Sequence, residues 1–181
     1  VGAIKAALHR GRVKLSATSN APRPAPSEGL VDQFVDAFNA RDLERVASLL
    51  RADATGEVVA MGASHGRGPI RDSSLYYSLF LEKGEPRAER RDFHGESVVV
   101  IWYALEPGTP IVRDVMRFEE LEGQISRLRF YAFCPETMAE VVAALGLPFK
   151  PNGYGVWSPD FLELQDTPAF ERWMKEGTPA G

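Results

Sequence analysis

The spacing of hydrophobic residues changes once along this chain, near residue 87, and that change limits the folds open to it. Before this point, apolar residues recur every three or four positions, as they do on one face of a helix. After it, four segments have the pattern of strands: residues 87–94, 97–105, 111–120 and 124–133. Helices followed by a run of neighbouring strands favour an α+β fold with an antiparallel sheet.

The second predicted strand, SVVVIWYAL, is nearly all apolar. A strand of this composition is typical of a central position, covered on both faces of the sheet. The third and fourth strands are joined by ELEGQ, where Gly123 suits a turn conformation that most residues resist.

Three helices are predicted before the sheet. Ser27 is a suitable N-cap for the first, which presents an apolar face over about three turns. Asp42 caps the second, which runs through Leu50. A short strand (55–61) and a glycine-rich turn, MGASHGRG, lead to the third, over residues 69–81. MGASHGRG lacks the lysine and the glycine spacing of a phosphate-binding loop.

The ends of the chain differ from this central part. Beyond the sheet, a helix is predicted from Pro135 to the stop signal at Gly146, with one more short amphipathic helix near the end. Before it, residues 2–15 have helical spacing, and a spacer with alternating prolines follows. We therefore divide the chain into a basic helix (1–15), a linker (16–27), a main domain (28–133) and a helical extension (134–181).

Charge separates the basic helix from the rest. The chain carries 21 Lys and Arg against 25 Asp and Glu, a net charge of −4. Lys5, Arg10, Arg12 and Lys14 stand in the first fifteen residues without any acid, so the remainder is acidic. The main domain is therefore not expected to bind nucleic acid, whereas the basic helix and the domain are expected to have separate partners.

Other classes are disfavoured by what the sequence lacks. The single cysteine, Cys134, excludes an internal disulfide and has no nearby histidine to activate it as a nucleophile. No apolar run is long enough for a membrane span and no signal peptide is evident, so we expect a cytoplasmic protein that does not contact membranes. The three scattered histidines have no metal-ligand spacing, and we expect neither a metal nor a cofactor.

Two segments resemble the nuclear-transport-factor-two-like fold, which includes the ketosteroid isomerases and the SnoaL-like polyketide cyclases. ARDLERVASLLRADAT (40–55) is similar to its capped helix leading into the first strand. RDVMRFEELEGQISRLRFYAF (113–133) resembles the last hairpin of the isomerases. The resemblance covers about residues 28–133 and implies a cone-shaped bent sheet with three helices before it. It says little about chemistry, because this fold hosts many functions.

The resemblance also locates the groups that an isomerase needs. A carboxylate base moves a proton beside a carbonyl, and two acidic O–H groups hold the enolate oxygen. The base position matches Val58 and the tyrosine donor matches Phe34, whereas the second donor, a carboxylic acid kept neutral, matches Asp114. Valine and phenylalanine cannot do this work, so the isomerase mechanism is not expected.

Asp114 has two interpretations. It is a buried acid that hydrogen-bonds a ligand in the cone, or it pairs with a neighbour such as Arg113, Arg129 or His94, or faces solvent. A cone closed at one end often keeps a cavity, so a small apolar ligand is considered. Besides Asp114, the side chains expected to line the cone are Phe34, Phe38, Val58, Tyr76, Phe80, Trp102, Met116, Phe118 and Phe130.

The basic helix carries a second resemblance. VGAIKAALHRGRVKL is similar to the end of the recognition helix in region four of extracytoplasmic-function sigma factors. The residues that this resemblance assigns to promoter DNA are Lys5, His9, Arg10 and Arg12. Some of these sigma factors carry a SnoaL-like domain after region four, and FCPETMAEVVAALGLPFKPNGY (133–154) is similar to the extension that follows it.

Three functional hypotheses follow. The first is a regulatory C-terminal domain of an alternative sigma factor that acts on RNA polymerase core and promoter DNA, tuned by a ligand in the cone. Because region two and the start of region four are absent, we expect the chain to be part of a longer protein. The second is an enzyme, a cyclase, isomerase or hydrolase, that uses Asp114 with His94 or Tyr103. The third is a ligand-binding or homodimerising module unrelated to transcription.

Overall fold

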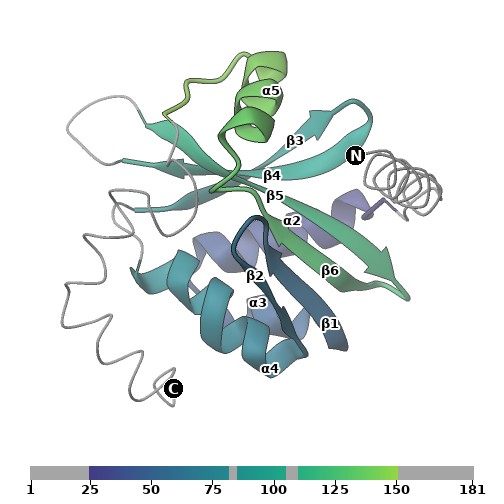
Figure 1. The fold of residues 1–181 in the computed structure, drawn as a ribbon. Coiled ribbons are helices and arrows are strands. Elements are labelled where there is room, and N and C mark those ends of the chain that lie inside the picture. Colours follow the sequence, from purple (N-terminus) through teal and green to yellow (C-terminus); the bar gives the residue numbers. More distant parts are fainter. Residues whose placement is uncertain (1–24, 82–84, 105–109, 151–181) are drawn as a thin grey trace, which may run out of the picture.

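A computed structural model describes residues 25–81, 85–104 and 110–150 (Figure 1). In chain order the regular elements are α2 (Glu28–Asn39), α3 (Leu43–Ser48), β1 (Leu50–Val58), β2 (Gly62–His65), α4 (Arg67–Ile70), the π-helical segments η1 (Arg71–Leu75) and η2 (Tyr77–Leu81), β3 (Arg87–Phe93), β4 (Glu96–Tyr103), β5 (Ile111–Leu121), β6 (Gln124–Phe130) and α5 (Pro135–Leu145).

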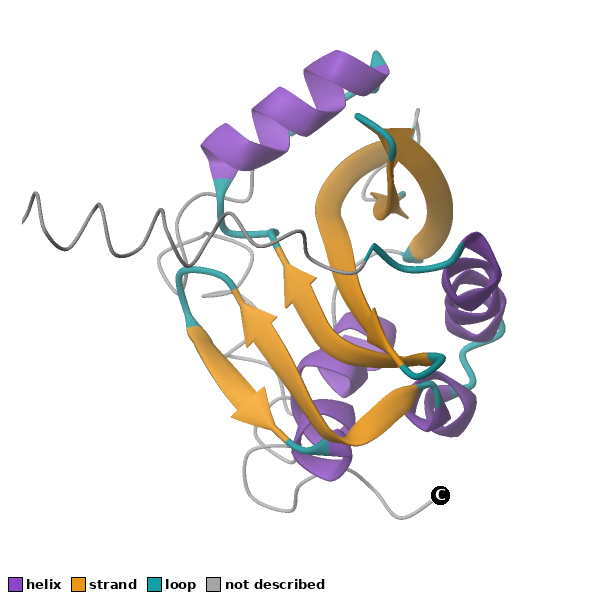
Figure 2. Cartoon of the chain, turned by 90° about the vertical axis from the view of Figure 1, so that its right-hand side faces the viewer, coloured by secondary structure: helices purple, strands orange, loops and turns teal. Residues whose placement is uncertain are grey.

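The strands form one sheet in the order β2-β1-β6-β5-β4-β3. Neighbouring strands are antiparallel except β1 and β6, which run parallel. The sheet curves strongly (Figure 2). Helices α2, α3 and α4 cover what we call the inner face, and α5 lies on the opposite, outer face (Figure 1). The predicted α+β fold with a bent, open sheet is confirmed.

Strand β4 separates two hydrophobic cores. Val99 and Ile101 face the inner core, which includes the apolar residues of α2, and Val98 and Val100 face the outer core beneath α5. All four are 0% exposed. Alternate side chains of a strand point to opposite faces, so the unbroken apolar run of this strand fills both cores. This confirms the prediction of a strand covered on both sides.

Local capping confirms the predicted starts of α2 and α3 and the predicted end of α5, whereas two other boundaries were wrong: α3 ends at Ser48 instead of Leu50, and β1 spans Leu50–Val58 instead of residues 55–61. The Asp42 side chain accepts a hydrogen bond from the Arg45 backbone N–H (2.9 Å) at the start of α3. Gly146 ends α5 in the left-handed conformation, with φ of 66°. Ser27 is the N-cap of α2, and its hydroxyl accepts a longer bond from the Leu30 N–H (3.4 Å).

The glycine-rich segment is not simply the turn that we predicted. Its residues 62–65 form β2, which pairs antiparallel with β1. A tight turn precedes it, in which Ala60 has a φ of 72° and the Met61 N–H donates to the Val58 carbonyl (2.9 Å). The small, polar side chains of β2 carry no apolar alternation, because backbone pairing along the edge of β1 forms this strand.

The predicted helix over 69–81 is helical, but most of it is π-helix rather than α-helix. The Ser73 hydroxyl donates to the carbonyl of Pro69 (2.6 Å), four residues earlier. A side chain that bonds this carbonyl competes with the backbone ladder of an α-helix. The widened helix places successive side chains at other angles than the 3.6-residue repeat predicts.

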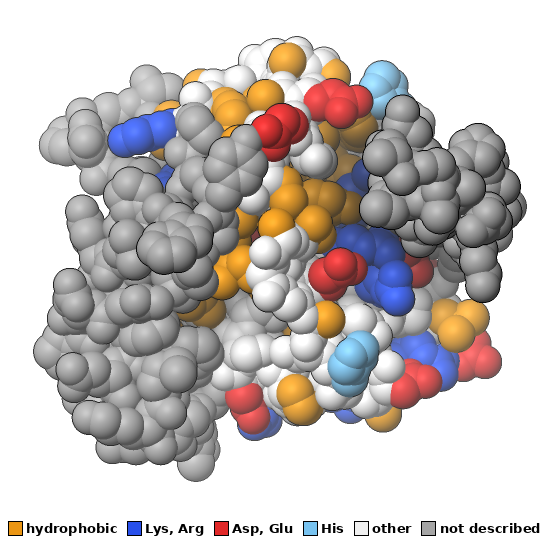
Figure 3. Space-filling model, viewed as in Figure 1, with side chains coloured by type: hydrophobic (Ala, Val, Ile, Leu, Met, Phe, Trp, Pro, Cys, Tyr) orange, Lys and Arg blue, Asp and Glu red, His pale blue; other side chains and the backbone are white. Residues whose placement is uncertain are grey.

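The predicted basic helix, most of the linker and the last amphipathic helix lie outside the described residues. Within the described ranges, no helix is long and apolar enough to cross a membrane. On the face shown in Figure 3, apolar side chains gather near the centre and charged side chains flank them.

Candidate functional site

Three aromatic rings that we predicted to line a pocket pack directly on one another at the inner face. The ring of Phe34 lies 4.7 Å from that of Phe118 and 5.9 Å from that of Phe38, between centroids. Their exposed fractions are between 0% and 3%. These rings are therefore part of the inner core, and they hold α2 against β5.

The neighbouring part of the predicted lining lies across three adjacent strands. Phe130 in β6 pairs in register with Met116 in β5 and with Val58 in β1. Met116 and Phe130 are buried in the same core as the three rings, and Val58 packs against it partly buried. The structure thus brings these predicted residues together, in a packed hydrophobic arrangement.

The two positions that match the isomerase base and tyrosine consequently carry hydrocarbon in hydrophobic surroundings. Neither Val58 nor Phe34 has an atom that could accept or donate a proton. A water or an acid recruited to this part of the core would require desolvation of a polar group, which is costly without a partner. Proton abstraction by the isomerase route has no base at these positions.

Asp114 is buried, with 4% of its surface exposed, and pairs in register with Ile101 of β4. One of its oxygens, Oδ1, accepts a hydrogen bond from the Tyr131 backbone N–H (2.9 Å), just beyond the end of β6. Among the partners considered for it, Arg129 is engaged by Glu57 (3.2 Å) and Glu119 (2.8 Å). The Asp114 carboxyl thus has a structural role in fixing the chain after β6.

Cys134 lies three residues after Tyr131, and the charge of the Asp114 carboxylate affects its pKa. Burial raises the pKa of the Cys134 thiol, and the negative charges of Asp114, Glu136 and Glu57 raise it further. The thiol lies 3.7 Å from the carbonyl oxygen of Val59. A raised pKa disfavours the thiolate, so the environment opposes the nucleophilic role that the sequence also disfavoured.

Three predicted lining residues lie elsewhere. Trp102 packs against the outer core, because it follows the same alternation as Val98 and Val100. Tyr76 and Phe80 form a ring pair (5.2 Å) on the π-helical segment, and Phe80 is 47% exposed. The position of Trp102 was mispredicted because an all-apolar strand does not indicate which residues face which core. Tyr76 and Phe80 were mispredicted because the π-helix turns side chains away from the directions expected in an α-helix.

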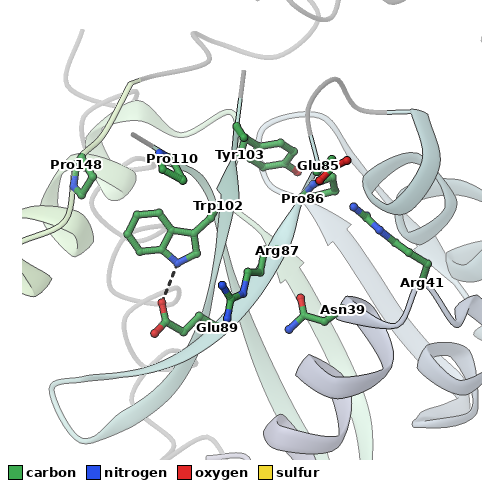
Figure 4. Close-up of a pocket in the computed structure, with 11 residues that line it drawn as sticks. Asn39, Arg41, Glu85, Pro86, Arg87, Glu89, Trp102, Tyr103, Pro110 and Pro148 are labelled. Atoms are coloured by element: carbon green, nitrogen blue, oxygen red, sulfur yellow. Dashed lines mark hydrogen bonds between the residues drawn. The ribbon is translucent and has the colours of Figure 1, made fainter. Parts of the chain in front are cut away.

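A hollow of about 960 Å³ lies at the end of the sheet where β3 begins and β4 ends (Figure 4). Sequence reasoning missed it, because its walls come from five separate places in the chain. Its lining includes Asn39, Arg41, Arg87, Glu89, Trp102 and Tyr103, together with Pro110 before β5 and Pro148 after α5. The adjacent Trp102 and Tyr103 were the only hint of this hollow in the sequence, because nothing in the sequence indicates which other residues lie beside them.

The structure also shows where two of the histidines lie, whereas the predicted DNA-binding residues are not among those it describes. The ring of His94, in the β3–β4 turn, lies tilted against that of Phe93 (4.3 Å between centroids), and His65 lies in β2 with its Nδ1 3.4 Å from the Thr55 hydroxyl. Among the residues that the structure describes, no cluster of three metal-ligating side chains occurs. The predicted DNA-binding residues, Lys5, His9, Arg10 and Arg12, lie outside them.

Comparison with known families matches residues 31–128, more than half of the chain, to the SnoaL-like domain. The chain belongs to the SnoaL-like domain family. The resemblance drawn from the two sequence segments is thereby confirmed for the domain. Membership of a sigma factor stays a prediction, because the match concerns the domain alone.

Several solved structures are similar to this chain at low sequence identity. An NTF2-like protein from Cytophaga hutchinsonii is 15% identical, with 65% of this chain and 98% of that one covered and a TM-score of 0.43. A putative polyketide cyclase from Sinorhizobium meliloti is 18% identical, with coverage of 58% and 95% and a TM-score of 0.46. A putative ketosteroid isomerase from Kribbella flavida is 19% identical, with coverage of 56% and 73% and a TM-score of 0.43. No curated protein matches the chain significantly.

Proposed function

We propose that this SnoaL-like domain is a regulatory domain of an alternative sigma factor and not an enzyme of the isomerase type. The observation that argues against isomerase chemistry is the hydrophobic packing at the two reactive positions: Phe34 is 0% exposed against Phe118, and Val58 packs on the same core. A cone that retained isomerase chemistry would need polar, proton-transferring groups there. The link to transcription rests on the sequence of residues 1–15.

In this proposal the domain acts through contacts with the sigma regions that bind polymerase and promoter. Such a domain can favour an engaged or a disengaged arrangement, and a ligand can shift that equilibrium only by its differential affinity for the two. A tenfold shift requires about 1.4 kcal/mol of differential binding. Residues 1–15, the predicted basic helix, carry +4 from Lys and Arg side chains and would supply phosphate contacts.

The direct test is to capture the native protein from its source cells with an antibody raised against residues 28–133. We expect a polypeptide well above 20.0 kDa that co-purifies with core RNA polymerase. As a control, an excess of the purified 181-residue chain added before capture should abolish recovery of both. A native polypeptide of 20.0 kDa without polymerase would contradict the proposal.

An enzyme that uses Asp114 is the second candidate, favoured by the 4% exposure of this acid at the family's donor position. Asp114→Asn discriminates, because the asparagine Oδ1 can still accept from the Tyr131 N–H while the acid is lost. Asp36→Asn, on the exposed side of α2, is the matched control.

The assay is the isomerisation of a β,γ-unsaturated ketone, followed by the absorbance of the conjugated enone. Under the regulatory proposal, the wild type and both variants should give the uncatalysed rate. Turnover by the wild type and Asp36→Asn that is lost in Asp114→Asn, with circular dichroism unchanged, would instead support the enzyme and overturn our proposal.

A further inference from the structure

The hollow at the end of β3 and β4 has one rigid apolar wall. The indole N–H of Trp102 donates to Glu89 (2.9 Å), while the ring packs against the outer core beneath α5. Pro110 and Pro148 lie on the same side of the hollow (Figure 4). Pro148 is held in place because its carbonyl accepts from the Val112 N–H (3.0 Å). This wall offers flat apolar surfaces in a fixed arrangement.

Most polar groups around the hollow are already engaged by the protein. The Asn39 side chain exchanges two hydrogen bonds with the backbone of Ala88 (2.8 and 3.0 Å). Arg41 donates to the carbonyl of Leu79 (3.0 Å). Glu89, beyond its bond to the indole, pairs with Arg91 (2.9 Å). These bonds fix the frame of the hollow.

Arg87 differs from these groups. Its side chain is exposed, and with the residues that the structure describes it forms neither a hydrogen bond nor an ion pair. Figure 4 shows it near the centre of the hollow, between Trp102 on one side and Asn39 on the other. Glu85 lies on the side of Arg41 in the same view. Within the described ranges, Arg87 is therefore a cation of this hollow that has no protein partner and can receive an anion.

We propose that this hollow binds a small planar aromatic carboxylate, with its ring against Trp102 and its carboxylate on the Arg87 guanidinium. A guanidinium matches a carboxylate with two parallel hydrogen bonds, and an aromatic ring gains by stacking on an indole or a proline. The volume, about 960 Å³, is at the upper end of the range for small-molecule sites.

This site lies at the end of the sheet where β3 begins and β4 ends, and it goes beyond the proposed function because it needs neither polymerase nor residues 1–15. One of its walls, Pro148, follows α5 and so lies beyond residues 31–128, the part of the chain that matches the family. The extension after the SnoaL-like domain therefore helps to build the site.

The test is a titration of the full 181-residue chain with 2-naphthoate, followed by the NMR signals of the tryptophan indole N–H groups. The chain has three tryptophans, and Trp102→Phe identifies the signal of Trp102. We expect a saturable shift of that signal. Arg87→Gln should weaken binding about tenfold or more, the usual effect of losing a charge-assisted hydrogen bond. Arg45→Gln, an exposed arginine on α3, should leave the affinity unchanged.

A neutral analogue separates stacking from charge recognition. 2-Naphthalenemethanol should bind the wild type about tenfold more weakly than 2-naphthoate, and Arg87→Gln should not weaken it further. Three results would each overturn the proposal: no saturable shift of the Trp102 signal, equal affinity of Arg87→Gln and Arg45→Gln for 2-naphthoate, or equal affinity of the wild type for the acid and the alcohol. Circular dichroism of each variant checks that it is folded.

Discussion

Gly56 lies directly against Ile70 of α4, and replacing this glycine by alanine tests how the inner core is packed. It is buried in β1 beside Leu128 of β6. A Cβ atom at this position would lie 2.9 Å from Cγ1 and 3.0 Å from Cγ2 of Ile70. Both atoms branch from the Ile70 Cβ, and Ile70 is 0% exposed, so the side chain has no free space into which to rotate.

The magnitude follows from this geometry. Overpacking a core costs about 1–3 kcal/mol, and the lower entropy of the unfolded alanine variant returns about 0.4–1 kcal/mol. We expect Gly56→Ala to destabilise by roughly 1–2 kcal/mol. Ile70→Ala alone should cost about 2–5 kcal/mol because it leaves a cavity. In the double variant the clashing atoms are gone and the new methyl group partly fills that cavity.

The double variant should therefore be no less stable than Ile70→Ala, a coupling of roughly 1–2 kcal/mol between the sites. Urea unfolding followed by circular dichroism gives each free energy, provided that the slope m is constant. Gly29→Ala is the control, because a Cβ there meets nothing within 4 Å and its effect should simply add to that of Ile70→Ala. If the effects of Gly56→Ala and Ile70→Ala add within about 0.5 kcal/mol, the steric argument is wrong.

Two further predictions concern a bridge and a thiol. Asn39→Ala should lower the free energy of unfolding, measured by urea denaturation, by about 2 kcal/mol, because it removes both hydrogen bonds between the Asn39 side chain and Ala88. A loss below about 0.5 kcal/mol would show that these two hydrogen bonds contribute little to stability. The raised pKa of Cys134 leaves less thiolate at a given pH, so its alkylation by iodoacetamide should follow a curve displaced to higher pH than that of the urea-unfolded chain. Asp114→Asn should move that curve back toward lower pH, whereas a native curve at or below the unfolded one would contradict the assignment.

Local signals were enough for much of this fold. The caps at Asp42 and Gly146 and the apolar periods of α2 and α5 are decided by residues a few positions apart. The same holds for β4, where an unbroken apolar run requires two covered faces. The hydrocarbon at the isomerase positions was also legible in the sequence, since the resemblance places those positions by number.

Other features depended on which segments meet, and here only the tertiary structure decided. β2 exists because β1 offers it an unpaired backbone edge, and the hollow exists because Asn39, Arg87, Trp102 and Pro148 come together from distant parts of the chain. Trp102 faces the outer core, because the pairing of β4 with β3 and β5 fixes which side chains point to each face. The sequence by itself determined the capped helices α2 and α5, the four strands after residue 87 and the absent isomerase groups. Contacts between segments far apart in the chain decided the edge strand, the placement of Trp102 and the hollow, because such contacts leave no local pattern to read.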